Sequence, residues 1–491
     1  MNYRPYAKFL RRDFLYIPKL NAQKIEIWFK NKKEIFMGDF NKIVNLCKSR
    51  GLIFPGSDIY DGLANTWDYG PVGVELKNNI KRAWWKKFVQ ESHNSFGIDA
   101  DIFMNSRVWE ASGHTASFSD PKMDCKSCKT RHRADNLIEA HSKGTVNPDL
   151  MSNEEMEKYI VEHHVCCPKC GKCDWTNIRN FNLMFSTSRG VTDDSQNLIY
   201  LRPETAQGEF VNFLNVQRSM RAKVPFGIAQ IGKAFRNEVT PGNFTFRTIE
   251  FEQMEHQWFC KPEDSMKFYA DYKQKAMDFL LSLGFNKDHL RYHDHDKLAH
   301  YAKAACDIQY LYPIGWEELN GIHHRGDWDL SRHQEFSGKS MQYLDPYTNE
   351  KYIPNVVEYS IGADRLTLAV MCEAYDEQKL EDGETRVVMH FHPALAPYKV
   401  AVLPLQKNLS EKAEEVYREL SKHFMVSYDE AGSIGKRYRR QDEIGTPMCV
   451  TIDFDTLENN TVTVRDRDTM QQIRLSVDEL VPYIEKQVTY C

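Results

Sequence analysis

Apolar positions recur every three to four residues in several stretches of the chain. A long pattern of this kind spans 73–90 and carries Leu76, Ile80, Ala83, Trp84 and Phe88. This spacing predicts one long amphipathic helix that packs against a large core. Similar patterns predict helices over 39–48, 265–283 and 363–375, and residues 261–310 as a whole are expected to be helical.

Strand-like patterns cover residues 181–260 and return over 321–357. They are joined by long connections rather than by regular strand–helix–strand repeats, which favours an α+β fold with a mostly antiparallel sheet flanked by helices. From about residue 397 a short apolar run, a helix, a second apolar run and a further helix and strand follow one another. That alternation predicts a small α/β domain at 397–491.

The chain has 491 residues, which corresponds to about three structural units. We expect an N-terminal extension at 1–36, a large core domain at 37–392 that contains an inserted module at 120–180, and the C-terminal domain at 397–491. The 42% hydrophobic and 27% charged residues exclude a disordered or collagen-like chain. No apolar stretch approaches the roughly 18 residues that a membrane span needs, so we expect no membrane association.

The net charge of −5 provides no global basic field, so nucleic-acid binding would need a local patch. Residues 1–36 carry nine Lys or Arg against three acidic residues but match neither a signal peptide nor a mitochondrial presequence. We interpret them as a dispensable extension before Met37, the alternative being a basic arm that contacts RNA.

Twelve cysteines are too few for a disulfide scaffold of this length and favour a reducing, cytoplasmic compartment. Cys125-x2-Cys128 and Cys167-Pro-Lys-Cys170-Gly, 38 residues apart, can supply four thiolates to a structural Zn²⁺. Cys170-x2-Cys173 offers a competing register, and unused thiols are the alternative to a metal site. The neighbouring His163 and His164 are expected to be surface residues.

The segment 227–255 contains a turn at Pro241-Gly242-Asn243 between two strands, which predicts an antiparallel hairpin with a long loop. Because side chains alternate along a strand, Arg236 and Glu238 share one face of the first strand. On the second strand, one face carries Arg247, Phe251, Gln253 and Glu255. If the two faces coincide, they suit a nucleotide: guanidinium groups bind phosphate, a ring stacks on the base and a carboxylate accepts from an amine. The alternative is a solvated amphipathic hairpin.

Phe235-Arg236-Asn237-Glu238 and Arg247-x3-Phe251-x3-Glu255 resemble motif 2 of the class II aminoacyl-tRNA synthetases. Val357 to Leu366 resembles motif 3, with Gly362 before a helix that carries Arg365 in its first turn, where the helix dipole favours an anion. Motif 1 is matched less well: the helix over 73–90 is present, but the proline that usually follows is not evident.

Longer strings in order over residues 38–491 resemble the homodimeric glycyl-tRNA synthetase family. They include Gly56 to Tyr60, Asn65 to Pro71, Ser106 to His114, Phe181 to Phe185, Leu201 to Gly208 and Phe251 to Glu255. The resemblance implies glycine, ATP with Mg²⁺ and tRNA(Gly) as substrates, a homodimer, and a Zn²⁺ site in the Cys167 and Cys170 register. One departure is Tyr359, where the family usually has proline.

The resemblance also implies roles for individual residues. Arg236 would hold the α-phosphate, Glu238 the adenine amine, and Arg247 and Arg365 the outer phosphates, with Arg236 and Arg365 as the catalytic pair. The implied ATP site is Arg236, Asn237, Glu238, Phe246, Arg247, Thr248, Ile249, Glu250, Phe251, Glu318, Leu319, Gly362, Ala363, Asp364 and Arg365. The implied glycine site is Arg107, Glu204, Phe251, Glu252, Gln253, Met254, Glu255, Glu358, Tyr359, Ser360, Ile361 and Gly362. The metal ligands are Cys125, Cys128, Cys167 and Cys170.

Glycine offers only an ammonium and a carboxylate, so a selective pocket needs negative charge and walls that exclude a Cβ atom. Glu204 and Glu255 supply the charge, although either could instead form a structural ion pair. Lys436 to Arg440 interleaves four cations with a tyrosine, which suits contacts with an anticodon. A solvated helix face is the alternative. Rival interpretations of the whole chain are another class II synthetase and a non-catalytic relative, which would have lost the phosphate-binding arginines.

Overall fold

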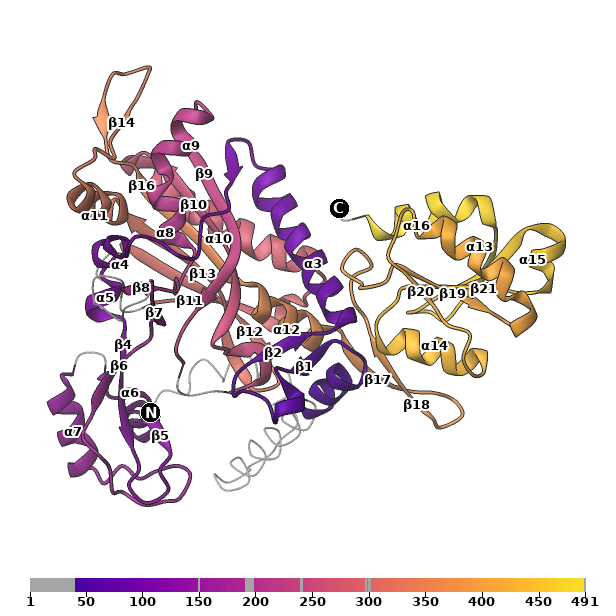
Figure 1. Ribbon diagram of the computed structural model, residues 1–491, viewed down its shortest axis with the longest axis horizontal. Helices are drawn as coiled ribbons and strands as arrows, with labels where there is room; N and C mark the ends of the chain where they lie inside the picture. The colour runs from indigo at the N-terminus through magenta and orange to yellow at the C-terminus, as the bar shows by residue number, and fades with distance from the viewer. Residues whose placement is uncertain are drawn as a thin grey trace, which may run out of the picture.

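The computed structural model describes residues 40–148, 151–189, 198–238, 242–295, 298 and 302–489. The predicted extension at 1–36 and Pro241 of the predicted turn lie outside these residues. Within the described part, three regions are evident in Figure 1: a large core, an insertion on one side of it and a C-terminal domain on the other.

A seven-stranded sheet forms the centre of the core, in the order β11-β12-β13-β16-β10-β9-β3. All neighbouring strands are antiparallel except β3 and β9, which confirms the expected antiparallel character. The strands are β3 (Ser95–Gly97), β9 (Phe226–Phe235), β10 (Glu250–Cys260), β11 (Leu290–Asp294), β12 (Ala304–Tyr312), β13 (Gly315–Gly326) and β16 (Asn355–Gly362).

Helices cover one face of this sheet. The predicted long helix is α3 (Pro71–Trp85), which continues as a π-helical turn over Lys86–Gln90, and the other predicted helices are residues 40–49, α10 (Ser265–Ser282) and α12 (Ala363–Ala374). Their apolar side chains share one buried core with alternate strand residues such as Met254, Tyr359 and Ile361. The opposite face is covered at one end by α8 (Ala206–Val211), α9 (Phe213–Ser219) and α11 (Trp328–Ser337).

Three of the predicted stretches are corrected by the structure. Residues 181–260 contain α8 and α9, because Ala206, Phe210, Phe213 and Val216 follow helical rather than strand spacing. Residues 261–310 are not helical throughout: β11 and most of β12 lie there, and they are stabilised because β11 pairs with β12 and β12 pairs with β13. The strand-like stretch 321–357 contains helix α11. Short apolar runs do not distinguish helix from strand, so partners distant in sequence decide.

The insertion is a small unit with its own core. Its sheet has the order β5 (Arg131–Arg133), β4 (Ser119–Asp124), β6 (Arg179–Asn182), and α6 (Ala134–Ser142) and α7 (Asn153–Glu162) pack beside it. Met123, Ile138 and Ile160 form part of the shared core. Shorter elements complete the large core around the seven-stranded sheet: β1 (Ile53–Pro55), β2 (Trp67–Tyr69), α4 (Ser106–Ala111), α5 (His114–Ser117), β7 (Ser186–Ser188), β8 (Leu198–Tyr200), β14 (Tyr343–Leu344) and β15 (Lys351–Tyr352).

The C-terminal domain is the predicted α/β unit. Its sheet has the order β20 (Val426–Tyr428), β19 (Val400–Pro404), β21 (Met448–Ile452), β22 (Thr461–Asp466), β23 (Gln472–Ser476), with helices α13 (Ser410–Leu420), α14 (Ile434–Glu443), α15 (Phe454–Asn459) and α16 (Leu480–Val488). A hairpin of β17 (Tyr375–Lys379) and β18 (Thr385–Met389) joins it to the core, and the buried Arg386 Nε donates to Asp442 Oδ2 at 2.8 Å.

Among the described residues, none of the helices combines the length and the hydropathy that crossing a bilayer requires.

Candidate active site and cysteine cluster

A cavity of about 490 Å³ lies over the face of the central sheet that α3 and α12 do not cover. Its floor comes from the ends of β10, β13 and β16, and one wall comes from the base of the insertion. The predicted site residues that line it are Glu204, Arg236, Glu238, Phe246, Arg247, Thr248, Phe251, Gln253, Glu255, Glu318, Leu319, Glu358, Ser360, Gly362, Asp364 and Arg365. The two predicted faces of the hairpin therefore do coincide.

The other predicted site residues do not line this cavity, mostly because side chains alternate along strands. Met254, Tyr359 and Ile361 point to the helix-covered face and are buried in the apolar core. Glu252 points the same way and binds lysines of α3. Arg107 lies exposed on α4, where its guanidinium donates to the backbone carbonyl of Phe336. The remaining such residues are Asn237, Ile249, Glu250 and Ala363.

Arginines gather at one end of the cavity. Arg236 follows β9, and its Nε donates to the carbonyl of Pro203 at 3.0 Å while its guanidinium lies 5.4 Å from the centroid of the Phe251 ring. Arg365, in the first turn of α12, lies 3.2 Å from Glu318 and 4.5 Å from the centroid of the Phe246 ring.

The third arginine at this end, Arg247, lies 3.4 Å from Glu238. Three guanidinium groups held by aromatic faces and single carboxylates suit a polyphosphate.

Carboxylates gather at the other end of the cavity. Glu255 accepts from Ser360 Oγ at 2.8 Å, from Gln253 Nε2 at 3.1 Å and from the hydroxyl of Thr205. Glu204 lies 3.5 Å from His114 Nε2 and accepts from Gln207 Nε2 at 2.9 Å.

The third carboxylate, Glu358, accepts from Arg325 Nη1 at 3.0 Å and lies 2.8 Å from His323 Nδ1. Glu204 and Glu358 thus each have a cation or a protonatable ring beside them, whereas the donors to Glu255 are all neutral.

This difference sets the charge of the three carboxyls. Burial raises the pKa of Glu255 to about 7, and the nearby Glu358 and Glu204 add to the effect. Burial would also raise the pKa of Glu204 and of Glu358. His114 and Arg325 outweigh it for Glu204, and Arg325 and His323 outweigh it for Glu358, so both pKa values lie below their ordinary range. Glu255 is therefore the carboxyl whose charge an incoming cation would stabilise most.

The sequence reasoning missed several residues that line the cavity, chiefly Arg325, His323, Asp120 and Arg133. Arg325 lies on β13, where its Nε donates to Asp329 Oδ2 at 2.7 Å, so its guanidinium is fixed from behind. Alternation along β13 could have found both Arg325 and His323, because they share a strand face with Gly321. No local signal marks Asp120 and Arg133, which reach the cavity only through the docking of the insertion.

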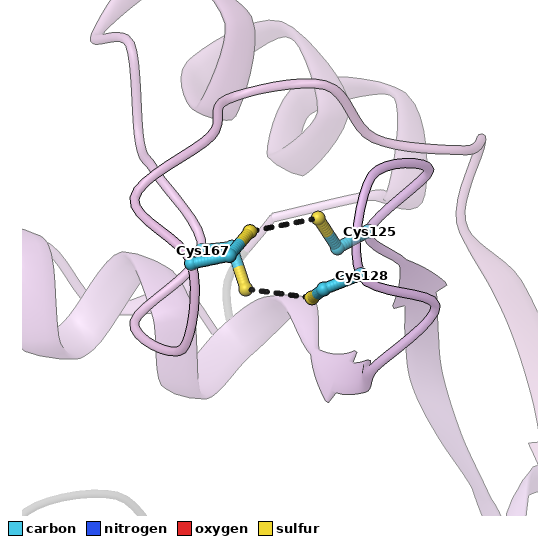
Figure 2. A group of neighbouring side chains, drawn as sticks. Cys125, Cys128 and Cys167 are labelled. Carbon is cyan, nitrogen blue, oxygen red and sulfur yellow. Dashed lines mark hydrogen bonds between the residues drawn. The ribbon is translucent and has the colours of Figure 1, made fainter.

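The four predicted cysteine ligands converge in the insertion. The sulfur atoms of Cys125, Cys128, Cys167 and Cys170 all lie within 4.8 Å of one another. The Cys128 sulfur lies 3.7 Å from that of Cys167, as Figure 2 shows, and the Cys125 sulfur lies 3.6 Å from that of Cys170. Four thiols this close are a tetrahedral zinc donor set, with no carboxylate or water position required. The residues present fit a structural Zn²⁺.

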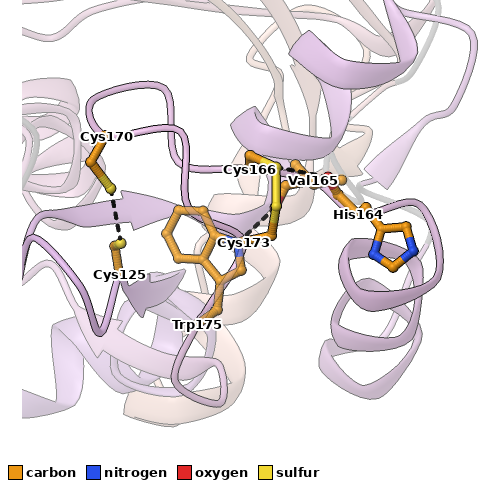
Figure 3. Close-up of a disulfide and its surroundings, with 7 residues drawn as sticks. All are labelled: Cys125, His164, Val165, Cys166, Cys170, Cys173 and Trp175. Carbon is orange, nitrogen blue, oxygen red and sulfur yellow. Dashed lines mark hydrogen bonds between the residues drawn. A yellow bond between two sulfur atoms is a disulfide. The ribbon is translucent and has the colours of Figure 1, made fainter.

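The competing register is excluded by a disulfide. Cys166 and Cys173, which flank the knuckle, are bonded to each other, so Cys173 has no thiol to offer, as Figure 3 shows. This disulfide was not anticipated from the sequence. The neighbouring Trp175 Nε1 donates to the carbonyl of Val165 at 2.8 Å, which closes the same loop. His163 and His164 are exposed, as predicted.

The basic run on α14 is more internal than its sequence indicates. Arg437 is buried and donates to the carbonyl of Pro404, and Arg440 lies 2.6 Å from Asp429. Lys436 is exposed, and Arg439 lies 3.7 Å from Asp442. Two of the four cations thus hold the domain together.

Comparisons with known proteins agree with this architecture. Residues 185–375 match the tRNA synthetase class II core domain (G, H, P, S and T), and residues 399–487 match the anticodon binding domain. Together with the antiparallel sheet and its arginine-lined cavity, these matches define a class II aminoacyl-tRNA synthetase with an anticodon-binding domain.

Similar curated proteins show to which family of class II synthetases the chain belongs. The glycine–tRNA ligase of Clostridium kluyveri is 60% identical over 461 residues, covering 93% of this chain and 100% of the relative. That of Geobacillus thermodenitrificans is 61% identical over 454 residues, covering 91% of this chain and 97% of the relative. The chain belongs to the glycine–tRNA ligase family.

Proposed function

We propose that this chain attaches glycine to tRNA(Gly) in two steps, through a glycyl-adenylate. The observation that carries the proposal is one cavity with three arginines at one end and three glutamates at the other. ATP and an amino acid meet in such a cavity with their charges matched, phosphates to guanidinium groups and ammonium to carboxylates.

At the nucleotide end, Arg236 binds the α-phosphate, and Arg247 and Arg365 bind the outer phosphates. Phe251 stacks on the adenine ring, and Glu238 accepts from its amine. Asn237, Ile249, Glu250 and Ala363 contribute through the backbone that shapes this end. Glu318, which lines the cavity beside Arg365, would bind the Mg²⁺ that accompanies ATP and offsets the charge of its phosphates.

At the amino-acid end, Glu204, Glu255 and Glu358 surround the ammonium of glycine, and Ser360 positions Glu255. Arg325 supplies a fixed positive charge for the substrate carboxylate. The backbone of Met254, Tyr359 and Ile361 holds these side chains in register across the β10–β16 pair, in which Glu255 and Ser360 are direct partners. Arg107 acts from outside the cavity.

In the first step a carboxylate oxygen of glycine attacks the α-phosphorus, and the bond from that phosphorus to the bridging oxygen breaks as pyrophosphate leaves. In the second step a hydroxyl of the terminal ribose of tRNA attacks the glycyl carbonyl, and AMP leaves. No enzyme nucleophile is needed, because the glycine carboxylate and the ribose hydroxyl are themselves the nucleophiles. Arg236 and Arg365 stabilise the charge that develops on the phosphates.

Cys125, Cys128, Cys167 and Cys170 would hold one Zn²⁺, which supplies folding energy to the insertion rather than chemistry. We further propose that the active form is a homodimer and that the reaction takes place in the cytoplasm. Nine of the described cysteines form no disulfide, which suits a reducing compartment, whereas the Cys166–Cys173 bond does not.

ATP–pyrophosphate exchange with each of the twenty amino acids tests the proposal. Exchange that depends on glycine and disappears in Arg236→Ala is the expected result. Exchange with a different amino acid would refute the assignment of the carboxylate end, and folded protein without exchange would favour a binding protein that has lost catalysis.

A further inference from the structure

Lys77 lies on α3, among the helices that cover the sheet face opposite the cavity, and is only 6% exposed. Its Nζ lies 2.7 Å from Asp364 Oδ1 and 3.0 Å from Glu252 Oε2. A buried ammonium with two carboxylates at these distances is an ion-pair cluster whose members depend on one another. Burial lowers the pKa of Lys77, but Asp364 and Glu252 outweigh this and raise it, so the lysine is charged.

The cluster joins three segments that are far apart in sequence. Asp364 Oδ2 accepts from the backbone N–H of Glu252 at 2.7 Å, which ties the first turn of α12 to the start of β10. Lys81, one turn further along α3, lies 2.7 Å from Glu252 Oε1 and is a quarter exposed. Lys77 is thus the member that contacts both acids, whereas the ion pair of Lys81 is with Glu252.

Each acid of the cluster adjoins a residue of the nucleotide end. Glu252 follows Phe251, whose ring faces the cavity, and Asp364 precedes Arg365. Asp364 itself also lines the cavity. Without Lys77, Lys81 would still pair with Glu252, but Asp364 would lose the lysine paired with it, so its negative charge would be uncompensated beside the place where phosphates bind.

We propose that Lys77 is a positioning residue for ATP: it holds Asp364 against β10, and so fixes Phe251 and Arg365, and it neutralises Asp364 beside the phosphates. The inference rests on the proposed function of the cavity. It predicts an effect at the nucleotide end only, because the glycine-facing carboxylates have other partners.

The test is steady-state ATP–pyrophosphate exchange with Lys77→Met, which removes the charge and keeps the length of the side chain. The KM for ATP should rise about tenfold or more, while the KM for glycine changes by less than about threefold. Lys81→Met is the matched control, since it removes a lysine bound to Glu252 but not to Asp364, and its KM for ATP should stay within about threefold of the parent value. Lys77→Arg keeps the charge and should restore most of the ATP affinity.

Thermal unfolding of each variant separates positioning from general destabilisation. Equal increases in both KM values, or a lower unfolding temperature with unchanged KM values, would overturn the proposal. If Lys77→Met does not fold, Lys77→Gln carries the same comparison. Failure of the parent protein to exchange with glycine would instead overturn the proposed function.

Discussion

Acidification is expected to weaken glycine binding through Glu255. The pKa of this carboxyl in the free protein is raised to about 7, chiefly by burial and then by Glu358 and Glu204. In the proposed site the ammonium of glycine binds the ionised form, so below that pKa Glu255 must lose its proton when glycine binds. Between about pH 8 and about pH 6 the ionised fraction falls from about nine-tenths to about one-tenth. The kcat/KM for glycine should therefore fall about tenfold over that range.

The assay is pyrophosphate exchange at saturating ATP with glycine varied at several pH values. The KM for ATP, measured in the same buffers, should change little, because the arginines at its end stay charged. Glu255→Gln should bind glycine more weakly throughout and lose the pH dependence.

The imidazole of His323 is the competing explanation. Burial lowers the pKa of His323, but the hydrogen bond to Glu358 outweighs it and raises the pKa, so this ring gains a proton in the same direction of pH. A kcat/KM for glycine that is flat with pH, or a pH dependence that survives in Glu255→Gln, would refute the reasoning about Glu255.

Three further predictions concern other parts of the molecule. Arg365→Ala should lower kcat/KM for ATP about 100-fold or more, with an unchanged KM for glycine, since one phosphate ligand is lost; a change confined to glycine would contradict this. Gly321→Ala places a Cβ atom 2.7 Å from His323 Cε1, so the ring beside Glu358 must move and the KM for glycine should rise about tenfold in exchange assays. Cys167→Ser should reduce zinc, measured by mass spectrometry, from about one per chain to near zero and lower the unfolding temperature of the insertion; undiminished zinc would contradict the ligand set.

The parts of the fold that follow from local pattern were predictable. Helices α3, α10 and α12 have long apolar stripes, and the hairpin of β9 and β10 has alternation over many residues. For the same reason, the cavity-facing residues of β10 could be named in advance. Glu252 and Met254 were assigned to the site through the family resemblance, although the period of two places them on the other face.

The remainder depends on contacts that no local pattern encodes. β12 forms because β11 and β13 pair with it on either side, and Asp120 reaches the cavity because the insertion docks there. Arg325 is about thirty residues from Glu358, its hydrogen-bond partner, and only the β13–β16 pairing brings the two side chains together. The disulfide between Cys166 and Cys173 was likewise not evident from spacing, since Cys173 also fits a metal-binding register with Cys170.

The insertion forms one wall of the cavity, so the folding of the insertion decides whether a molecule of this protein is active. Asp120 and Arg133 belong to the sheet of the insertion, lie 2.9 Å apart and line the cavity. A molecule whose insertion is unfolded therefore lacks one wall of the cavity that we propose binds ATP. Partial loss of the proposed Zn²⁺ from the insertion should lower the fraction of active molecules, which titration of bound adenylate measures. The molecules that remain folded should keep the normal KM for ATP and for glycine.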